Sequence, residues 1–376
     1  MNIINKIKIL LFLCISFLGC HKEEVDSPKA FASRTVLVYL GVDNNFRAEA
    51  LQKLRHLKNS WSKEIDGNLL IYSDTGEKSF LINIYYSPHR GAVADTIKTY
   101  AAENSASAET LARVMNTVKA FRPAESYGLV VLSHGTGWLP AEMSTPYVGL
   151  KSIIKDQSTN NVTGYYMELT DFARAIPYKL DFIIFDACWM AGVEVAYELK
   201  DKADYIVASS AEVLEPGFVY GTMMKSLFKP KPDLAAVARE FYEYHNAQIA
   251  PYRSATVSVI KTASLDSLAQ IVKEISINPA IDNIQSFGHG SQRIFFDMGD
   301  YLQKMLPDRH EEINAALDRC IPYKASTSHY YSSATGKLEA INAFSGLTVY
   351  IAQEQYPVAN RHYGSLKWAN VTEYAF

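Results

Sequence analysis

The chain has 376 residues, of which 48% are apolar and 12% are aromatic. This composition is sufficient for a large hydrophobic core and excludes a chain that is disordered throughout. The formal net charge is -3, and acidic and basic residues are mixed along the chain, so nucleic acid is not an expected partner.

The N-terminal segment has the anatomy of a secretory signal peptide. Two lysines precede an apolar stretch at residues 9–18, and Gly19-Cys20 follows it. A small residue directly before a cysteine resembles the lipobox of bacterial lipoproteins, in which the cysteine is acylated. An ordinary signal peptide that is cut elsewhere is the alternative. The charged residues 21–24 resemble the tether of surface-exported lipoproteins of Bacteroidetes.

These features predict a lipoprotein signal peptide at residues 1–19 and a tether at residues 20–33. The protein is therefore expected to be exported and held in the outer membrane by a lipid on Cys20, facing the cell surface. The membrane would be a partner only through this anchor.

The cysteine count supports a catalytic thiol. Cys14 is lost with the signal peptide and Cys20 would be lipidated, which leaves Cys188 and Cys320. The two could form one disulfide, but the sequence has no CxxC metal pattern. We expect Cys320 to be structural, because it ends a predicted helix.

Apolar strand patterns alternate with amphipathic helix patterns along the rest of the chain. This alternation predicts an α/β fold with a mostly parallel sheet flanked by helices. The main domain is expected at residues 34–260, with a smaller C-terminal subdomain at residues 261–376. Strands are expected at residues 35–41, 68–73, 79–86, 127–133, 181–186, 204–209, 255–260 and 346–351, and helices at residues 109–121, 169–176, 188–199, 232–247, 264–277 and 309–319, with a further helix after residue 45.

Two reactive side chains each follow an apolar strand. His134 comes after the run Leu-Val-Val-Leu-Ser, and Cys188 comes after Phe-Ile-Ile-Phe-Asp-Ala. Functional groups collect at the carboxyl ends of strands in parallel α/β sheets, so the two side chains are expected to meet there. The histidine comes first, and the separation of 54 residues is close to the spacing of about 50 in caspases. Papain-like enzymes have the opposite order.

The surroundings of the pair favour nucleophilic catalysis. If Cys188 begins a helix, unpaired amides and the helix dipole would lower the pKa of its thiol. The amide of Gly135 could donate to a developing oxyanion. Each residue also has an ordinary alternative: His134 could cap a turn, and Cys188 could be a small buried side chain.

Four blocks of the sequence resemble clostripain-type enzymes, which form peptidase family C11 of clan CD. Residues 133–138, Ser-His-Gly-Thr-Gly-Trp, are similar to the histidine motif of that family. Residues 185–191, Phe-Asp-Ala-Cys-Trp-Met-Ala, are similar to its cysteine motif. Residues 35–45 resemble the opening strand and turn, and residues 208–217 resemble the segment after the next strand.

The resemblance implies a caspase-like fold and a cysteine endopeptidase that forms an acyl-enzyme with a His134/Cys188 dyad. Its substrates would be proteins or peptides with arginine or lysine at P1. Asp186 matches the acidic residue of the family's S1 pocket, where a carboxylate would pair with the basic side chain. Capping of the next helix is the alternative role for Asp186.

Other residues are assigned by the same resemblance. Ser209, Glu212 and Glu215 are candidate substrate contacts in the segment at residues 208–217. Lys151 and Lys155 are possible sites of self-cleavage, because they lie between the histidine and cysteine strands and suit the expected specificity.

No metal or organic cofactor is expected in the chemistry. Calcium is possible, but no EF-hand-like run of ligands supports it. The main alternative function is a catalytically silent caspase-like module that binds protein or peptide at the surface. A serine α/β-hydrolase is a weaker alternative, because the sequence lacks the nucleophile elbow of that class.

Overall fold

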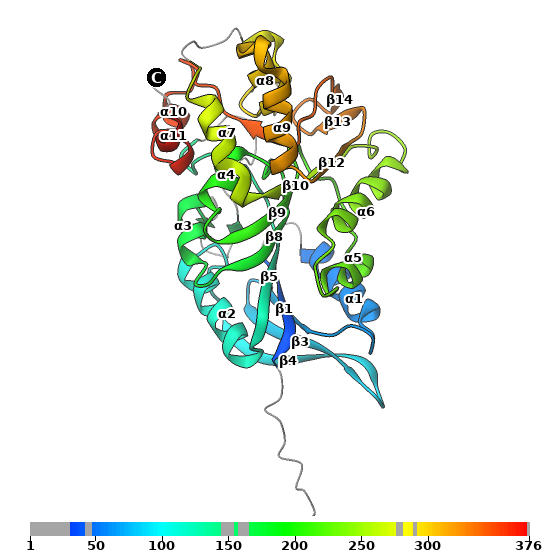
Figure 1. Ribbon diagram of the computed structural model, residues 1–376. Helices are drawn as coiled ribbons and strands as arrows, with labels where there is room; N and C mark the ends of the chain where they lie inside the picture. The colour runs from blue at the N-terminus through cyan, green and yellow to red at the C-terminus, as the bar shows by residue number, and fades with distance from the viewer. Residues whose placement is uncertain are drawn as a thin grey trace, which may run out of the picture. The chain divides into compact units, whose positions relative to one another are not determined.

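A nine-stranded sheet forms the centre of the protein (Figure 1). The computed structural model describes residues 31–41, 47–143, 154–156, 165–275, 281–288 and 292–373, and Ala32–Phe376 form one unit. In spatial order the strands are β12 (Tyr323–Ser326), β10 (Thr256–Lys261), β9 (Ala203–Ala208), β8 (Leu180–Asp186), β5 (Ala124–Leu132), β1 (Ala32–Leu40), β2 (Asn68–Asp74), β3 (Lys78–Ser87) and β4 (Gly91–Ala101). The predicted α/β class is confirmed, and β12, from the C-terminal part of the chain, completes one edge of the sheet.

The five central strands of the sheet, β9, β8, β5, β1 and β2, run parallel. Their sequences are near-continuous apolar runs because helices cover both faces of a parallel sheet. The four outer strands pair antiparallel. β4 was not predicted from the sequence, because most of its residues are only partly buried and its apolar pattern is weak.

Two layers of helices cover the sheet (Figure 1). On one face, α1 (Arg47–Ser60), α5 (Tyr220–Leu227) and α6 (Leu234–Asn246) share a hydrophobic core with alternate residues of the central strands. The opposite face is covered by α2 (Ala108–Phe121), α3 (Leu169–Ala175), α4 (Val193–Glu198) and α7 (Leu265–Val272). Alternation along β1 explains this division, since its side chains point in turn to either face.

The α2 helix shows how local sequence produces these layers. Ser107 is the N-cap, and its hydroxyl accepts the amide of Thr110 at 3.4 Å. Leu111, Val114 and Val118 are buried at helical spacing and form the inner face. The predicted helix at residues 109–121 is confirmed.

The last third of the chain adds helices and short strands. These are α8 (Met298–Met305), α9 (His310–Cys320), α10 (Pro357–Tyr363) and α11 (Lys367–Thr372), with 3-10 turns at Thr262–Ser264, Ile281–Asn283 and Pro307–Arg309. Two small sheets of this region pair β11 (Phe296–Asp297) with β15 (Thr348–Val349), and β13 (His329–Ser332) with β14 (Lys337–Ala340). Earlier in the chain, β6 (Lys155–Asp156) pairs with β7 (Tyr165–Tyr166). The strand expected at residues 346–351 is shortened to β15. Within the described residues, no helix is both long enough and apolar enough to cross a membrane.

The strand order creates a position for a functional site. From β1 the chain continues to β2 on one side, and β5 then pairs with the other side of β1, followed by β8 and β9. In open α/β sheets, ligands bind beyond the carboxyl ends of the strands at such a reversal. The loops that leave β5 and β8 lie there.

Candidate active site

His134 and Cys188 occupy equivalent positions at the ends of two neighbouring strands. Leu132, the last residue of β5, pairs with Asp186, the last residue of β8. His134 and Cys188 each lie two residues further on, and both are partly buried. Adjacent strands are about 4.8 Å apart, so the two loops leave the sheet side by side. The fold therefore places the two residues that the sequence indicated on neighbouring loops.

Two glycines allow the histidine loop to lie against the cysteine loop. A Cβ on Gly135 would be 2.6 Å from the carbonyl oxygen of Cys188 and 3.2 Å from its amide nitrogen. Gly137 has φ of +63°, and a Cβ there would be 2.8 Å from the carbonyl oxygen of Trp189. Only glycine fits both positions without a shift of backbone.

The turn that carries Cys188 is strained and held from several sides. Trp189 has φ of 55°, which is uncommon for a bulky residue. Its amide donates to the carbonyl of Ala211 at 3.1 Å, and its indole Nε1 donates to the carbonyl of Phe287 at 2.8 Å. The indole also stacks on Phe295 with ring centroids 5.9 Å apart. Strain of this kind is common at active sites.

Cys188 does not begin a helix, so this prediction was wrong. The α4 helix begins at Val193 after Gly192, and the residues between β8 and Gly192 form a turn. The thiol therefore gains no stabilisation from a helix dipole, which acts over the first turn only. Asp186 is likewise too far from α4 to cap it. The turn prevails over local helix propensity because Trp189 and Ala191 donate to the carbonyls of Ala211 and Ser209.

The environment of the Cys188 thiol favours its neutral form. Burial raises the pKa of Cys188 to about 12, and the nearby carboxylate of Glu212 adds to this rise. The amide of Val213 lies 3.3 Å from Sγ and opposes the rise by donating a hydrogen bond. The pKa of the Cys188 thiol is therefore raised, and the predicted lowering was wrong. A thiol of this kind becomes a nucleophile by passing its proton to a neighbouring base.

A small pocket of about 20 Å³ lies beside Cys188. Three carboxyl side chains line it: Glu49 from α1, Asp186 from the end of β8, and Glu215 from the loop after β9. Glu215 is exposed, whereas the other two are buried. Burial raises the pKa of Glu49, although Lys53 counteracts this. The lining of the pocket therefore contains three carboxyl groups.

Asp186 already has a cationic partner within the protein. Its Oδ2 lies 2.6 Å from Nζ of Lys53, and its Oδ1 accepts the amide of Phe218 at 3.3 Å. Lys53 also lies 3.1 Å from Oε1 of Glu49 and donates to the carbonyl of Pro216 at 2.6 Å. The sequence gave no signal for this pair, because Lys53 and Asp186 are 133 residues apart.

The remaining candidate contacts take different positions. Glu212 is buried, and its Oε1 accepts the amide of Ser333 at 2.9 Å, which links it to the turn between β13 and β14. Ser209 is buried as well, and its hydroxyl donates to the carbonyl of Ala211 at 3.0 Å and lies 2.8 Å from the hydroxyl of Thr256. Both side chains hold the loop after β9. Of the three candidates in this loop, Glu215 lines the pocket.

Three residues are predicted to be sites of lipidation or self-cleavage: Cys20, Lys151 and Lys155. Cys20 and Lys151 lie outside the described residues. Lys155 begins the short strand β6, and its neighbour Asp156 is buried and accepts the amide of Ser105 at 2.6 Å. The peptide bond after Lys155 is therefore part of a paired strand.

Cys320 is a buried structural residue, as predicted. Its Sγ donates to the carbonyl of Ser264 at 3.1 Å, and burial raises its pKa to about 11. Cys320 and Cys188 are both free thiols, so the disulfide alternative is wrong.

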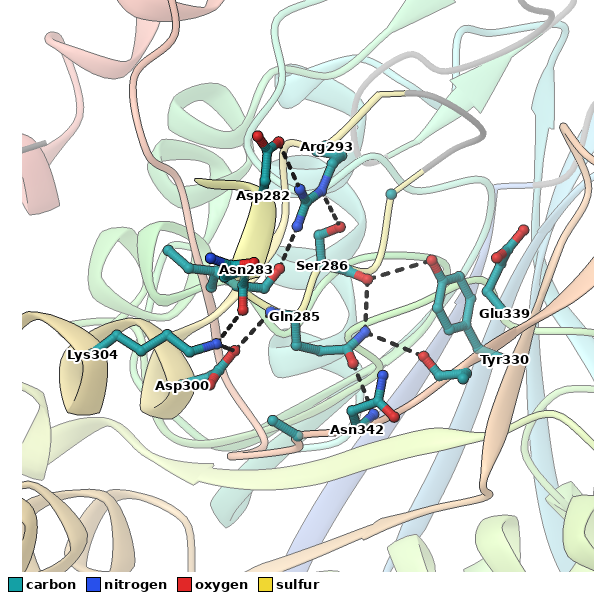
Figure 2. Close-up of a pocket in the computed structure, with 14 residues that line it drawn as sticks. Asp282, Asn283, Gln285, Ser286, Arg293, Asp300, Lys304, Tyr330, Glu339 and Asn342 are labelled. Carbon is teal, nitrogen blue, oxygen red and sulfur yellow. Dashed lines mark hydrogen bonds and ion pairs between the residues drawn. The ribbon is translucent and has the colours of Figure 1, made fainter. Parts of the chain in front are cut away.

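A larger polar cavity of about 410 Å³ lies between α8 and the β13–β14 hairpin (Figure 2). Four of its charged side chains form two ion pairs: Lys304 with Asp300 at 2.9 Å, and Arg293 with Asp282 at 3.5 Å. Cys188 does not line this cavity but does line the smaller pocket, so the smaller pocket is the candidate active site. Among the described residues, no group of three or more His, Cys, Asp or Glu side chains is arranged to hold a metal ion.

A cysteine and a histidine at the ends of adjacent parallel strands, on glycine-rich and strained turns, define a cysteine-dependent hydrolase of the α/β class. The sequence matches the Clostripain family, Peptidase C11, over residues 38–346. The chain therefore belongs to the clostripain family of cysteine proteases.

Individual relatives agree with this assignment. Clostripain of Hathewaya histolytica is 27% identical over 217 residues, which cover 50% of this chain and 40% of that protein. The match thus spans well under half of the curated relative. The structure resembles an inactive zymogen of a C11 protease from Parabacteroides distasonis, with 31% identity, a TM-score of 0.79, and coverage of 91% of this chain and 99% of that one. It also resembles a secreted C11 cysteine protease from Bacteroides thetaiotaomicron in complex with an irreversible peptide inhibitor, with 27% identity, a TM-score of 0.81, and coverage of 92% and 100%.

Proposed function

We propose that this protein is a cysteine endopeptidase that cleaves after arginine or lysine with Cys188 as nucleophile and His134 as general base and acid. The observation that carries the proposal is the matched register of the two residues beyond β5 and β8, next to a pocket lined by carboxylates. The Bacteroides thetaiotaomicron relative binds a peptide inhibitor, which supports a peptide as substrate.

The chemistry follows from the state of the thiol. Because burial keeps Cys188 protonated, its proton must move to His134 as Sγ attacks the scissile carbonyl carbon. The amide of Val213 can stabilise developing charge on Sγ, since it already lies at 3.3 Å. The imidazolium of His134 then protonates the leaving amine, and a thioester acyl-enzyme remains. Water deprotonated by His134 hydrolyses the thioester and restores the thiol.

Gly135 is the proposed donor to the oxyanion of the tetrahedral intermediate. Its backbone lies against the peptide of Cys188, because a Cβ added at Gly135 would lie 2.6 Å from the carbonyl oxygen of Cys188. A backbone amide in this place needs no reorganisation when charge develops on the carbonyl oxygen.

The test is a set of fluorogenic peptides that differ only at P1, with Arg, Lys, Asp and Leu. We expect cleavage of the Arg and Lys peptides, abolished by Cys188→Ala and by alkylation of Cys188. Cleavage of the Asp or Leu peptide alone would contradict the basic specificity. Full activity of Cys188→Ala would contradict the dyad, and no activity of the wild type on any peptide would favour the silent binding module.

Maturation by self-cleavage is a further part of the proposal. Lys151 is the better candidate, because cleavage after Lys155 would require β6 to open first. Mass spectrometry of the purified wild type and of Cys188→Ala should show a cut only in the wild type. Identical intact chains would refute self-cleavage.

The proposed location is the outer membrane, with the enzyme exported and anchored through an acylated Cys20. The basis is the signal peptide and lipobox-like pair in the sequence, and the relative from Bacteroides thetaiotaomicron is described as secreted. Metabolic labelling with a fatty acid should mark the wild type and not Cys20→Ser. Labelling of both proteins, or of neither, would refute this anchor.

A further inference from the structure

Lys53 lies where a basic substrate side chain would be received. It reaches from α1 to Asp186 at the end of β8, and its side chain is 4% exposed. Its Nζ is bound by Oδ2 of Asp186 at 2.6 Å, Oε1 of Glu49 at 3.1 Å and the carbonyl of Pro216 at 2.6 Å. It also lies 4.2 Å from the centroid of the Tyr220 ring.

These partners are those that a lysine ammonium prefers: carboxylates, a carbonyl oxygen and an aromatic face. Asp186 is the carboxylate that the proposed specificity assigns to P1. The protein thus supplies its own cation to that carboxylate. The pair is sequestered from solvent, since the Asp186 side chain is 1% exposed.

The pocket beside Cys188 agrees with this view. This pocket is small, about 20 Å³, and two of its three carboxyl groups, those of Asp186 and Glu49, contact the buried ammonium group of Lys53. A basic P1 side chain must therefore compete with Lys53 for Asp186 and Glu49, or rely on Glu215.

We propose, on the basis of the basic P1 specificity above, that Lys53 is a specificity-determining residue that competes with the P1 side chain for Asp186. Because it is part of the chain, Lys53 acts at an effective concentration that free substrate does not reach at micromolar levels. Asp186 therefore contributes little to the selection of basic P1 residues in the wild type. Removal of the Lys53 charge should make Asp186 available.

The first test is Lys53→Met, which keeps the length of the side chain and removes its charge. Steady-state kinetics would use peptides with Lys, Arg or norleucine at P1. We expect KM for the Lys and Arg peptides to fall about tenfold or more, the effect of one hydrogen-bonded charge pair, with kcat little changed. KM for the norleucine peptide should not change. Lys58→Met, an exposed lysine on the same helix, is the matched control and should behave like the wild type.

A second variant keeps the proposal testable if Lys53→Met alone fails to fold. Lys53→Met/Asp186→Asn removes both charges of the Lys53–Asp186 pair, while Glu49, which also contacts Lys53, keeps its carboxyl group. Because Lys53 already engages Asp186 in the wild type, the double variant should keep the wild-type ratio of kcat/KM between lysine and norleucine peptides. A loss of this ratio by about tenfold or more would show that Asp186 receives P1 despite Lys53, and would overturn the proposal.

The outcomes separate this inference from the proposed function. A wild type with strong basic preference that Lys53→Met does not increase would overturn the inference alone. Equal changes for charged and norleucine peptides would assign Lys53 a structural role and also overturn it. A wild type that prefers norleucine, with lysine cleavage gained in Lys53→Met, would support the inference and overturn the basic specificity of the natural enzyme. No cleavage of any peptide by the wild type would overturn both.

Discussion

Replacement of Gly135 by alanine tests whether the contact between the two loops matters for catalysis. The added Cβ would lie 2.6 Å from the carbonyl oxygen of Cys188 and 2.9 Å from Cβ of Ala187. Both neighbours belong to the turn of the nucleophile, and the nearest atom is backbone. The clash cannot be relieved by rotation of a flexible side chain.

The size of the effect follows from this distance. An ordinary contact begins at 3.4 Å, so one of the loops must move by about 0.8 Å. A displacement of about 1 Å in a catalytic group typically costs about 100-fold in rate. Overpacking of this kind typically costs about 1–3 kcal/mol of unfolding free energy. We therefore expect kcat/KM of Gly135→Ala to fall about 100-fold, while the protein stays folded.

The assay compares kcat/KM for a lysine peptide with the midpoint of urea unfolding for each variant. Gly221→Ala is the matched control, because Gly221 lies within α5 and an added Cβ meets no atom within 4 Å. This control should gain up to about 1 kcal/mol of unfolding free energy from helix propensity and keep wild-type activity. Wild-type activity of Gly135→Ala would refute the reasoning.

Three further predictions concern stability and the second thiol. Burial raises the pKa of Glu194 from 4.5 to about 8, so between these values the folded state holds a proton that the unfolded state releases. The unfolding free energy should therefore fall as pH rises from about 5 to 8, by up to about 1.4 kcal/mol per pH unit. Glu194→Gln, which can still accept the amide of Tyr350, should abolish this slope in urea unfolding, and parallel pH profiles would contradict the prediction. Asp233 caps α6 by accepting the amide of Ala236 at 3.0 Å, so Asp233→Ala should lower the unfolding free energy by about 1 kcal/mol, and an unchanged denaturation midpoint would count against the cap. Cys320→Ala should keep peptidase activity and lose about 1–2 kcal/mol of unfolding free energy. Loss of activity in a folded Cys320→Ala variant would show that catalysis needs Cys320 in addition to Cys188.

Local patterns in the sequence determined the α/β class and indicated the two residues of the proposed dyad. Uninterrupted apolar runs at β5 and β8 indicated strands that are buried on both faces, and parallel strands place their carboxyl ends together. His134 and Cys188 could be found because each directly follows such a strand. Their order in the chain favoured a caspase-like over a papain-like enzyme, and the adjacent Gly135 indicated a backbone donor for an oxyanion. These signals are carried by residues close together in the chain.

Local propensity failed where tertiary contacts compete with it. Residues 188–199 have the composition of a helix, but α4 begins only at Val193. The preceding turn is fixed by hydrogen bonds from Trp189 and Ala191 to residues after β9. The same failure reversed the expected direction of the Cys188 pKa, because burial acts on the thiol without a helix dipole to oppose it.

The state of the acidic pocket was decided by the tertiary structure. The sequence determined that a carboxylate, Asp186, precedes the nucleophile by two residues. It did not indicate that α1 packs Lys53 against this carboxylate, because the partners are separated by 133 residues and no periodicity links them. Since Coulomb interactions and desolvation depend on distance in space, the charge available to a substrate is defined only when the helix is placed on the sheet.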